Sequence, residues 1–150
     1  MANKLVQSPR IDDRYTCYRL KIRKSRIHRF GVYAAERIPA HRKVMEYTGE
    51  RISRRESKIR SSAGLTYLFE LDSYWNLDGA VGGSGAEMVN HSCEPNLRST
   101  NLRGHILYIS KRAIRPGEEL TLDYRLLGVI GKVKCFCGAE NCRGEINWKE

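Results

Sequence analysis

Three of the five cysteines stand close enough together to suggest a bound metal ion. Cys135, Cys137 and Cys142 fall within eight residues near the C-terminus. A disulfide between Cys135 and Cys137 would close a very strained ring, whereas three neighbouring thiolates supply most of a tetrahedral Zn²⁺ site. A fourth ligand is needed, and the spacing alone leaves Cys93 and Cys17 as candidates. The cluster therefore predicts a structural zinc site, with a reduced set of free thiols as the alternative.

Four further strings of residues precede this cluster. Residues 25–34 read Ser-Arg-Ile-His-Arg-Phe-Gly-Val-Tyr-Ala, and residues 46–50 read Glu-Tyr-Thr-Gly-Glu. Asn-His-Ser-Cys-Glu-Pro-Asn occupies residues 90–96, and Gly-Glu-Glu-Leu-Thr-Leu-Asp-Tyr occupies residues 117–124. Alone, the third string could be a polar turn with a capping asparagine. Together with the cysteine tail, in this order and at these spacings, the strings closely resemble the SET-domain protein-lysine N-methyltransferases with a post-SET tail.

The resemblance covers nearly the whole chain, from about residue 15 to residue 147. It implies a mostly β fold of small curved sheets, with a C-terminal pseudoknot and a zinc-bound post-SET tail. The chain would divide into a flexible N-terminal arm (1–14), a SET domain (15–130) and the tail (131–150). In the pseudoknot, residues 90–96 would lie beside residues 121–124, with a buried Asn96 joining them. The same pattern makes Cys93 the fourth zinc ligand and leaves Cys17 as an ordinary buried or free thiol.

The local pattern of residue types along the chain also favours a mostly β class. Short runs rich in Val, Ile, Tyr and Leu are interrupted by Gly and Pro, which is typical of strands and turns. Arg103-Gly104 predicts a hairpin turn, residues 51–61 predict one short exposed helix, and the four glycines of residues 79–85 predict a loop. The predicted strands are residues 15–22, 31–35, 43–52, 67–71, 97–102 and 105–111.

The resemblance implies that methyl groups pass from S-adenosylmethionine to a lysine amine. A free lysine has a pKa near 10.4, so the amine must first lose its proton. A narrow aromatic channel favours the neutral amine by desolvation, without a dedicated base. Tyr124 would be the catalytic tyrosine, with Tyr47 beside it, although Tyr47 could equally be an ordinary strand aromatic. Leu122 stands where relatives often carry Phe or Tyr, and this predicts more than monomethylation.

The resemblance also implies which residues hold the cofactor. The loop of residues 28–31 would cradle the methionine portion, and the phenyl ring between the zinc ligands would cover the adenine. Many relatives carry Gly where this chain has Arg29, so the shape of the loop is left open. The residues implied in cofactor binding are His28, Arg29, Phe30, Gly31, Tyr67, Asn90, His91 and Phe136.

The distribution of charge bears on the substrate. The chain has 150 residues and a formal net charge of +10. Residues 1–60 carry 17 basic and 6 acidic side chains, whereas residues 61–98 carry one basic and five acidic ones. The acidic segment could attract a basic peptide, and we expect a histone tail, or another basic protein, as the substrate. The basic part could contact nucleic acid.

The length corresponds to one domain. No apolar run reaches the roughly 18 to 20 residues that span a bilayer, and no apolar stretch at the N-terminus predicts a secretion signal. We therefore expect no membrane contact and an intracellular location, in the nucleus or cytoplasm, or secretion as an effector if the source is bacterial. The rival interpretation is a non-catalytic, zinc-stapled basic module that binds nucleic acid or protein. Intact Tyr124, Asn90 and His91 favour the enzyme.

Overall fold

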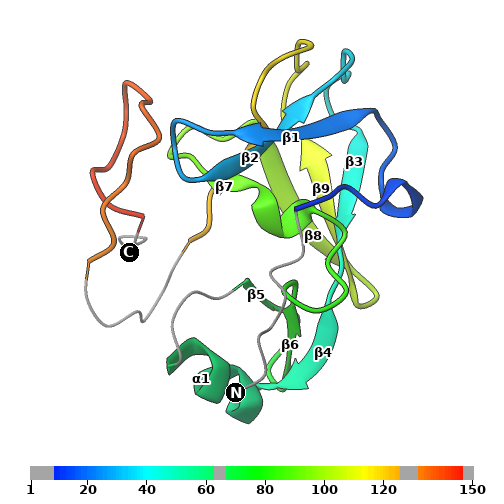
Figure 1. The fold of residues 1–150 in the computed structure, drawn as a ribbon, viewed down its shortest axis with the longest axis vertical. Coiled ribbons are helices and arrows are strands. Elements are labelled where there is room, and N and C mark those ends of the chain that lie inside the picture. Colours follow the sequence, from blue (N-terminus) through cyan, green and yellow to red (C-terminus); the bar gives the residue numbers. More distant parts are fainter. Residues whose placement is uncertain (1–8, 63–66, 126–131, 147–150) are drawn as a thin grey trace.

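The computed structural model describes residues 9–62, 67–125 and 132–146 (Figure 1). Within these residues ten strands form four small sheets. Two sheets have three antiparallel strands each, in the orders β3-β9-β8 and β4-β6-β5, and two are pairs, antiparallel β1-β2 and parallel β7-β10. The strands are β1 (Leu20–Lys24), β2 (Phe30–Ala34), β3 (Lys43–Tyr47), β4 (Glu50–Ser53), β5 (Leu68–Glu70), β6 (Trp75–Asp78), β7 (Asn90–His91), β8 (Leu97–Leu102), β9 (His105–Ser110) and β10 (Thr121–Leu122).

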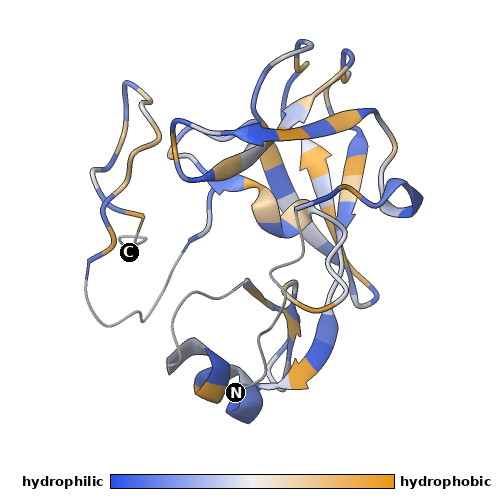
Figure 2. Ribbon diagram, viewed as in Figure 1, coloured by the Kyte–Doolittle hydropathy of each residue, from blue (hydrophilic) through white to orange (hydrophobic). Residues whose placement is uncertain are grey.

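The helices are short: α1 (Arg54–Ser62) and the 3-10 turns η1 (Asp13–Tyr15) and η2 (Ala86–Met88). The mostly β class is confirmed. Apolar and polar residues alternate along the strands (Figure 2), as expected when one face of each strand is buried. On β9, for example, Ile106 and Tyr108 are 2% exposed and pack in the single hydrophobic core found among the described residues.

Several predicted boundaries are wrong for identifiable reasons. The strand predicted from residue 15 begins only at Leu20, because the Asp12 side chain caps η1 by accepting the Arg14 N–H. The strand predicted over residues 43–52 is split, since the chain passes so close to β6 at Gly49 that a Cβ there would lie 2.4 Å from the Asp78 carbonyl oxygen. The helix begins at Arg54 rather than at residue 51. Strand β6 was not predicted.

Other elements match the sequence closely. Strand β8 has the predicted bounds, and β9 ends one residue early. Arg103 and Gly104 have φ values of 51° and 86° and form the expected tight hairpin turn between them. Residues 1–8 of the expected N-terminal arm lie outside the described residues. Ile11 packs against the core and Asp12 N–H donates to the Ser84 carbonyl oxygen at 2.9 Å, so the packed body begins before residue 15.

Arg60 fastens the polar helix α1 to the β4-β6-β5 sheet. Its guanidinium contacts Asp78 at 2.7 Å, Glu50 at 2.9 Å and Glu56 at 3.0 Å. The Asp78 side chain is only 8% exposed, so this ion pair is less screened by water than the other two. The contact stabilises the position of α1 at the end of the molecule away from β1 (Figure 1).

Asn96 joins two segments that are distant in sequence. Strands β7 and β10 pair in parallel, with Asn90 opposite Thr121 and His91 opposite Leu122. Next to this pair, the buried Asn96 amide donates to the Glu119 carbonyl oxygen at 2.8 Å and accepts the Thr121 N–H at 2.9 Å. The predicted juxtaposition and the structural role of Asn96 are therefore confirmed.

We predict that Asn96→Ala lowers the free energy of unfolding by about 2–4 kcal/mol, because it leaves one buried donor and one buried acceptor without partners. Urea denaturation followed by circular dichroism would measure the change. The matched control is Asn101→Ala, whose amide also bonds the backbone, to Leu71 and Gly104, but at an exposed position. In this control the free energy of unfolding should fall by about 1 kcal/mol or less, since water replaces the lost hydrogen bonds. Equal losses in the two variants would contradict the assignment.

Candidate functional site

Asn90 holds the loop of residues 28–31 against strand β7. Its amide nitrogen donates to the His28 carbonyl oxygen at 3.1 Å and to the Phe30 carbonyl oxygen at 2.9 Å. Arg29, between them, has a φ of 39°, in the left-handed region that glycine adopts most readily. Arg29 therefore has a backbone conformation typical of glycine. Five of the residues predicted to bind the cofactor, namely His28, Arg29, Phe30, Gly31 and Asn90, come together here.

Glu119 is a central acceptor in this region that the sequence analysis did not single out. Its carboxylate accepts the Asn90 amide at 2.9 Å, the Ser25 hydroxyl at 2.8 Å and the Tyr33 hydroxyl at 3.2 Å. A Cβ on Gly31 would lie 2.1 Å from Glu119 Oε1, so only glycine permits this approach. One carboxylate thus joins both strands of the β1-β2 hairpin to β7. Its place within the string of residues 117–124 was the only available signal.

His91 connects the backbone of Tyr124 with the cysteine cluster. The ring is 2% exposed, and burial, together with the charge of Arg143, lowers its pKa despite the carboxylate of Asp123. The Tyr124 N–H donates to Nδ1 at 3.1 Å, so Nε2 carries the proton and faces Cys93 Sγ at 3.5 Å. This neutral tautomer satisfies both ring nitrogens.

Tyr124 directs its hydroxyl inward, although the residue as a whole is 39% exposed. The hydroxyl donates to the Val89 carbonyl oxygen at 2.5 Å, and the ring meets the His91 ring edge-on at 5.4 Å. Burial of the hydroxyl raises the pKa of Tyr124 well above its ordinary value, with the neighbouring Tyr67 and Glu119 adding to the effect. The phenol is therefore a neutral donor throughout the physiological range.

Tyr47 belongs to a buried aromatic cluster with Phe69 and Tyr108. Its ring centroid lies 5.1 Å from that of Phe69 and 6.2 Å from that of Tyr108, and its hydroxyl donates to the Tyr67 carbonyl oxygen. Burial raises the pKa of both Tyr47 and Tyr108. Tyr47 and Tyr67, both predicted to lie beside the channel or the cofactor, thus contact each other. The sequence analysis did not identify Phe69 or Tyr108, because the pattern of apolar residues around each of them indicated only a strand.

The four cysteine sulfurs of Cys93, Cys135, Cys137 and Cys142 all lie within 4.8 Å of one another. Cys93 Sγ is 3.8 Å from Cys135 Sγ, which is close to the roughly 3.8 Å edge of a tetrahedron with Zn–S bonds of about 2.3 Å. The four thiols belong to one cluster, whereas Cys17 is exposed elsewhere. The donor set and its spacing fit a zinc ion.

The surroundings of the sulfurs differ: burial raises the pKa of Cys93 and of Cys135, whereas Cys137 is favoured as a thiolate. The backbone N–H groups of Arg143 and Gly144 donate to Cys93 Sγ at 3.3 Å and to Cys142 Sγ at 3.4 Å. Burial alone would raise the pKa of Cys137, but backbone N–H groups and the neighbouring thiols lower it to about 6. Arg143 also forms an ion pair with Asp123 at 3.0 Å. The tail is therefore fastened to the segment that carries Tyr124.

Three aromatic rings around the segment of residues 90–93 are open to solvent. Phe30 is 40% exposed and Phe136 is 60% exposed, with Tyr124 as described above. Phe30 bonds Asn90 through its carbonyl, Tyr124 packs on His91, and Phe136 adjoins the sulfur ligands. Exposed rings on elements that meet residues 90–93 fit a flat, partly apolar ligand.

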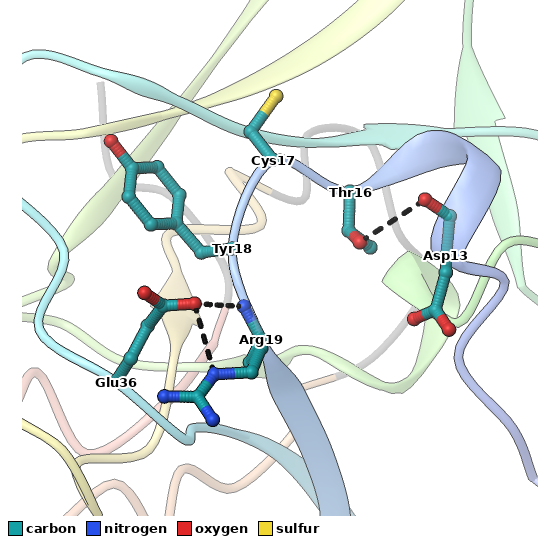
Figure 3. A pocket seen from close by; sticks show the side chains of 6 residues that line it. All are labelled: Asp13, Thr16, Cys17, Tyr18, Arg19 and Glu36. Carbon is teal, nitrogen blue, oxygen red and sulfur yellow. Dashed lines mark hydrogen bonds and ion pairs between the residues drawn. The ribbon is translucent and has the colours of Figure 1, made fainter.

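Figure 3 shows a separate surface hollow. It contains the Arg19–Glu36 ion pair and none of the residues predicted to act in catalysis or binding. Its lining residues are Asp13, Thr16, Cys17, Tyr18, Arg19 and Glu36. We assign no function to this hollow.

Comparison with known proteins identifies the fold family. Residues 29–125 match the model of the SET domain. The chain is 42% identical over 141 residues to the histone-lysine N-methyltransferase TRX1 of Oryza sativa, which covers 86% of this chain and 14% of the relative. It is 36% identical to histone-lysine N-methyltransferase set-2 of Caenorhabditis elegans, over 85% of this chain and 9% of the relative. It is also 36% identical to SETD1B of Homo sapiens, over 86% of this chain and 7% of the relative.

The chain thus spans about one seventh or less of the length of these relatives. The part of the chain that the structure describes contains no helix long and apolar enough to cross a membrane. The matched residues include β2 through β10, and so they contain the paired strands that bring Asn90, His91 and Tyr124 together. On the extent of this match, the chain is a member of the SET-domain family.

Proposed function

We propose that this chain transfers methyl groups from S-adenosylmethionine to a lysine of a basic protein. The observation that carries the proposal is the convergence of three elements on residues 90–93: the loop of residues 28–31, the Tyr124 side chain and the cysteine tail. The names of its relatives, which are histone-lysine N-methyltransferases, and the acidic segment of residues 61–98 favour a histone tail as substrate. Such a substrate would place the protein in a nucleus.

The chain's own residues suit this chemistry. When bound, S-adenosylmethionine would supply an electrophilic methyl carbon. Asn90 would keep the loop of residues 28–31 in place, and the neutral Tyr124 hydroxyl would orient the incoming amine. The buried rings of Tyr47 and Tyr108 would exclude water and so favour the uncharged amine that the reaction requires. Positioning and desolvation would supply most of the acceleration.

Leu122 bears on the number of methyl groups added. It is 4% exposed on β10, two residues before Tyr124. Leucine has no hydroxyl with which to hold a water molecule in the space that an added methyl group would fill. We therefore propose that the enzyme makes di- and trimethyl-lysine, and the mass of the peptide product distinguishes this from monomethylation.

We predict that Tyr124→Phe lowers kcat about 100-fold or more, because the variant loses the hydroxyl that would orient the reacting amine. The measurement is transfer of labelled methyl groups to core histones and to a basic-protein extract. Binding of S-adenosylmethionine should change by less than about 3-fold, since the backbone contacts of residue 124 remain. Tyr74→Phe, at a residue 76% exposed, is the matched control and should retain full activity. Undiminished kcat in Tyr124→Phe would overturn the catalytic role.

We propose Glu119 as a positioning residue for the cofactor loop. Glu119→Gln keeps the size of the side chain but loses its charge and turns one acceptor into a donor facing the Asn90 amide. The dissociation constant for S-adenosylmethionine, measured by calorimetry, should rise about 10-fold or more, with kcat at saturation nearly unchanged. Glu118→Gln, whose carboxylate pairs with the exposed Arg112, should leave both values unaltered. A fall in kcat alone would refute the positioning role.

We propose that Cys93, Cys135, Cys137 and Cys142 hold one Zn²⁺ and that this ion fixes Phe136 beside the cofactor. Elemental analysis should find about one zinc per chain. Chelation should weaken cofactor binding while far-ultraviolet circular dichroism of the sheets persists, because metal binding and folding of the tail are linked. Lowering the pH should release the metal, since protons compete for the thiolates.

The matched pair for this test is Cys137→Ser and Cys17→Ser. The first should lose zinc and the second should keep it, because Cys17 lies outside the cluster. Full zinc content in Cys137→Ser, or zinc loss in Cys17→Ser, would argue against this ligand set.

A further inference from the structure

Residues 19–29 form a continuous stretch of positive charge. Six of these eleven residues are Lys or Arg and none is acidic. They make up β1 and the turn that leads into β2. All six cations are exposed: Arg19, Lys21, Arg23, Lys24, Arg26 and Arg29.

The charge of this basic edge is not neutralised within the protein. Arg19 pairs with Glu36, but the other five form no ion pair with a carboxylate in the described residues. The nearby Glu119 is engaged inward by Ser25, Tyr33 and Asn90. Five uncompensated cations therefore stand along one short strand and its turn.

The position of β1 makes this edge accessible. It pairs only with β2 and leaves its outer side free, on the outside of the molecule (Figure 1). Edge strands often carry a lysine or another charge that prevents pairing with other chains. Preventing such pairing requires only one or two charges. The repulsion among five exposed cations is unfavourable, and a bound polyanion would relieve it.

The chemistry of the basic edge favours duplex nucleic acid over other polyanions. The apolar residues of β1, Leu20 and Ile22, pack against the core, so no apolar face remains to enter a lipid surface. The exposed ring nearest the edge, Phe30, belongs to the proposed cofactor site, which leaves no row of rings on which single-stranded bases could stack. Cations without stacking or apolar groups suit the sugar–phosphate backbone.

We propose that β1 and its turn bind the phosphate backbone of double-stranded DNA without sequence preference. The edge runs into residues 28–31, so DNA bound there would lie next to the loop proposed to hold the cofactor. A basic protein carried on DNA would then be held near the site. DNA binding is independent of methyl transfer, so each can fail without the other.

The test measures binding of a 20-base-pair duplex by fluorescence anisotropy over a range of salt concentrations. The variant is Lys21→Gln/Arg23→Gln/Lys24→Gln, which leaves the loop of residues 28–31 unchanged. Each phosphate contact contributes about 0.9 to the slope of log K against log salt. The slope should therefore become shallower by about 2 to 3, and affinity at low salt should fall at least 10-fold.

The matched control is Lys43→Gln/Arg98→Gln/Lys111→Gln, which removes the same charge from exposed positions around the β3-β9-β8 sheet. It should retain the wild-type slope to within about 1. Unchanged binding of S-adenosylmethionine and an unchanged melting temperature would show that both triple variants are folded.

Three outcomes would overturn the proposal: no duplex binding by the wild-type chain, equal losses in the two triple variants, or tighter binding to single-stranded RNA or to phosphatidylserine vesicles than to duplex DNA. A selective loss in the β1 variant, with the duplex as the preferred ligand, would support it.

Discussion

The short parallel pairing of β7 with β10 is the constraint on which the site depends. These strands are two residues long and contribute little stability by themselves. The surrounding side chains must therefore hold them together. Asn96 does this through the backbone of residues 119 and 121, and His91 does it through the backbone of Tyr124. Each uses a buried, neutral side chain with both hydrogen-bonding ends satisfied, which is the condition under which buried polar groups stabilise a fold.

From this pairing the other parts of the site follow by contact. Asn90 extends from β7 to the β1-β2 hairpin, and Cys93 follows two residues after β7 to meet the tail. Residues 90–96 therefore contact the loop of residues 28–31, the segment of residues 119–124 and the cysteine tail. This explains why a string that looks like an ordinary polar turn is so informative. Contacts on several sides restrict which residue types can occupy these positions, and few substitutions would satisfy all of these contacts.

The sequence was sufficient for the class and the family, because those depend on short strings with definite chemistry. Three members of the cysteine cluster could be predicted from thiol spacing, and Cys93, the buried Asn96 and the place of Tyr124 beside residues 90–96 from the resemblance. Glu119, Phe69 and Tyr108 could not be found in this way, since a lone carboxylate or a strand aromatic has no distinctive local pattern. Their roles arise from tertiary contacts, such as the approach of Glu119 to Gly31.

Boundaries were the weakest part of the prediction, and the errors share a cause. At Asp12 a side-chain cap, and at Gly49 a close backbone approach, redirect the chain where the apolar pattern runs on. Strand β6 was missed because Asn76 and Asp78 are residue types depleted in strands, and pairing with β4 and β5 on both sides holds it in place.

The four crowded sulfurs make the chain sensitive to oxidation when no metal is bound. Cys137 would then be largely ionised near neutral pH, with its pKa lowered to about 6, and three other thiols lie within 4.8 Å. A thiolate so close to other thiols is quickly oxidised to a disulfide. A single such bond would consume two ligands at once, so preparations exposed to air in the absence of zinc would lose the ability to take up the ion until a reductant was added.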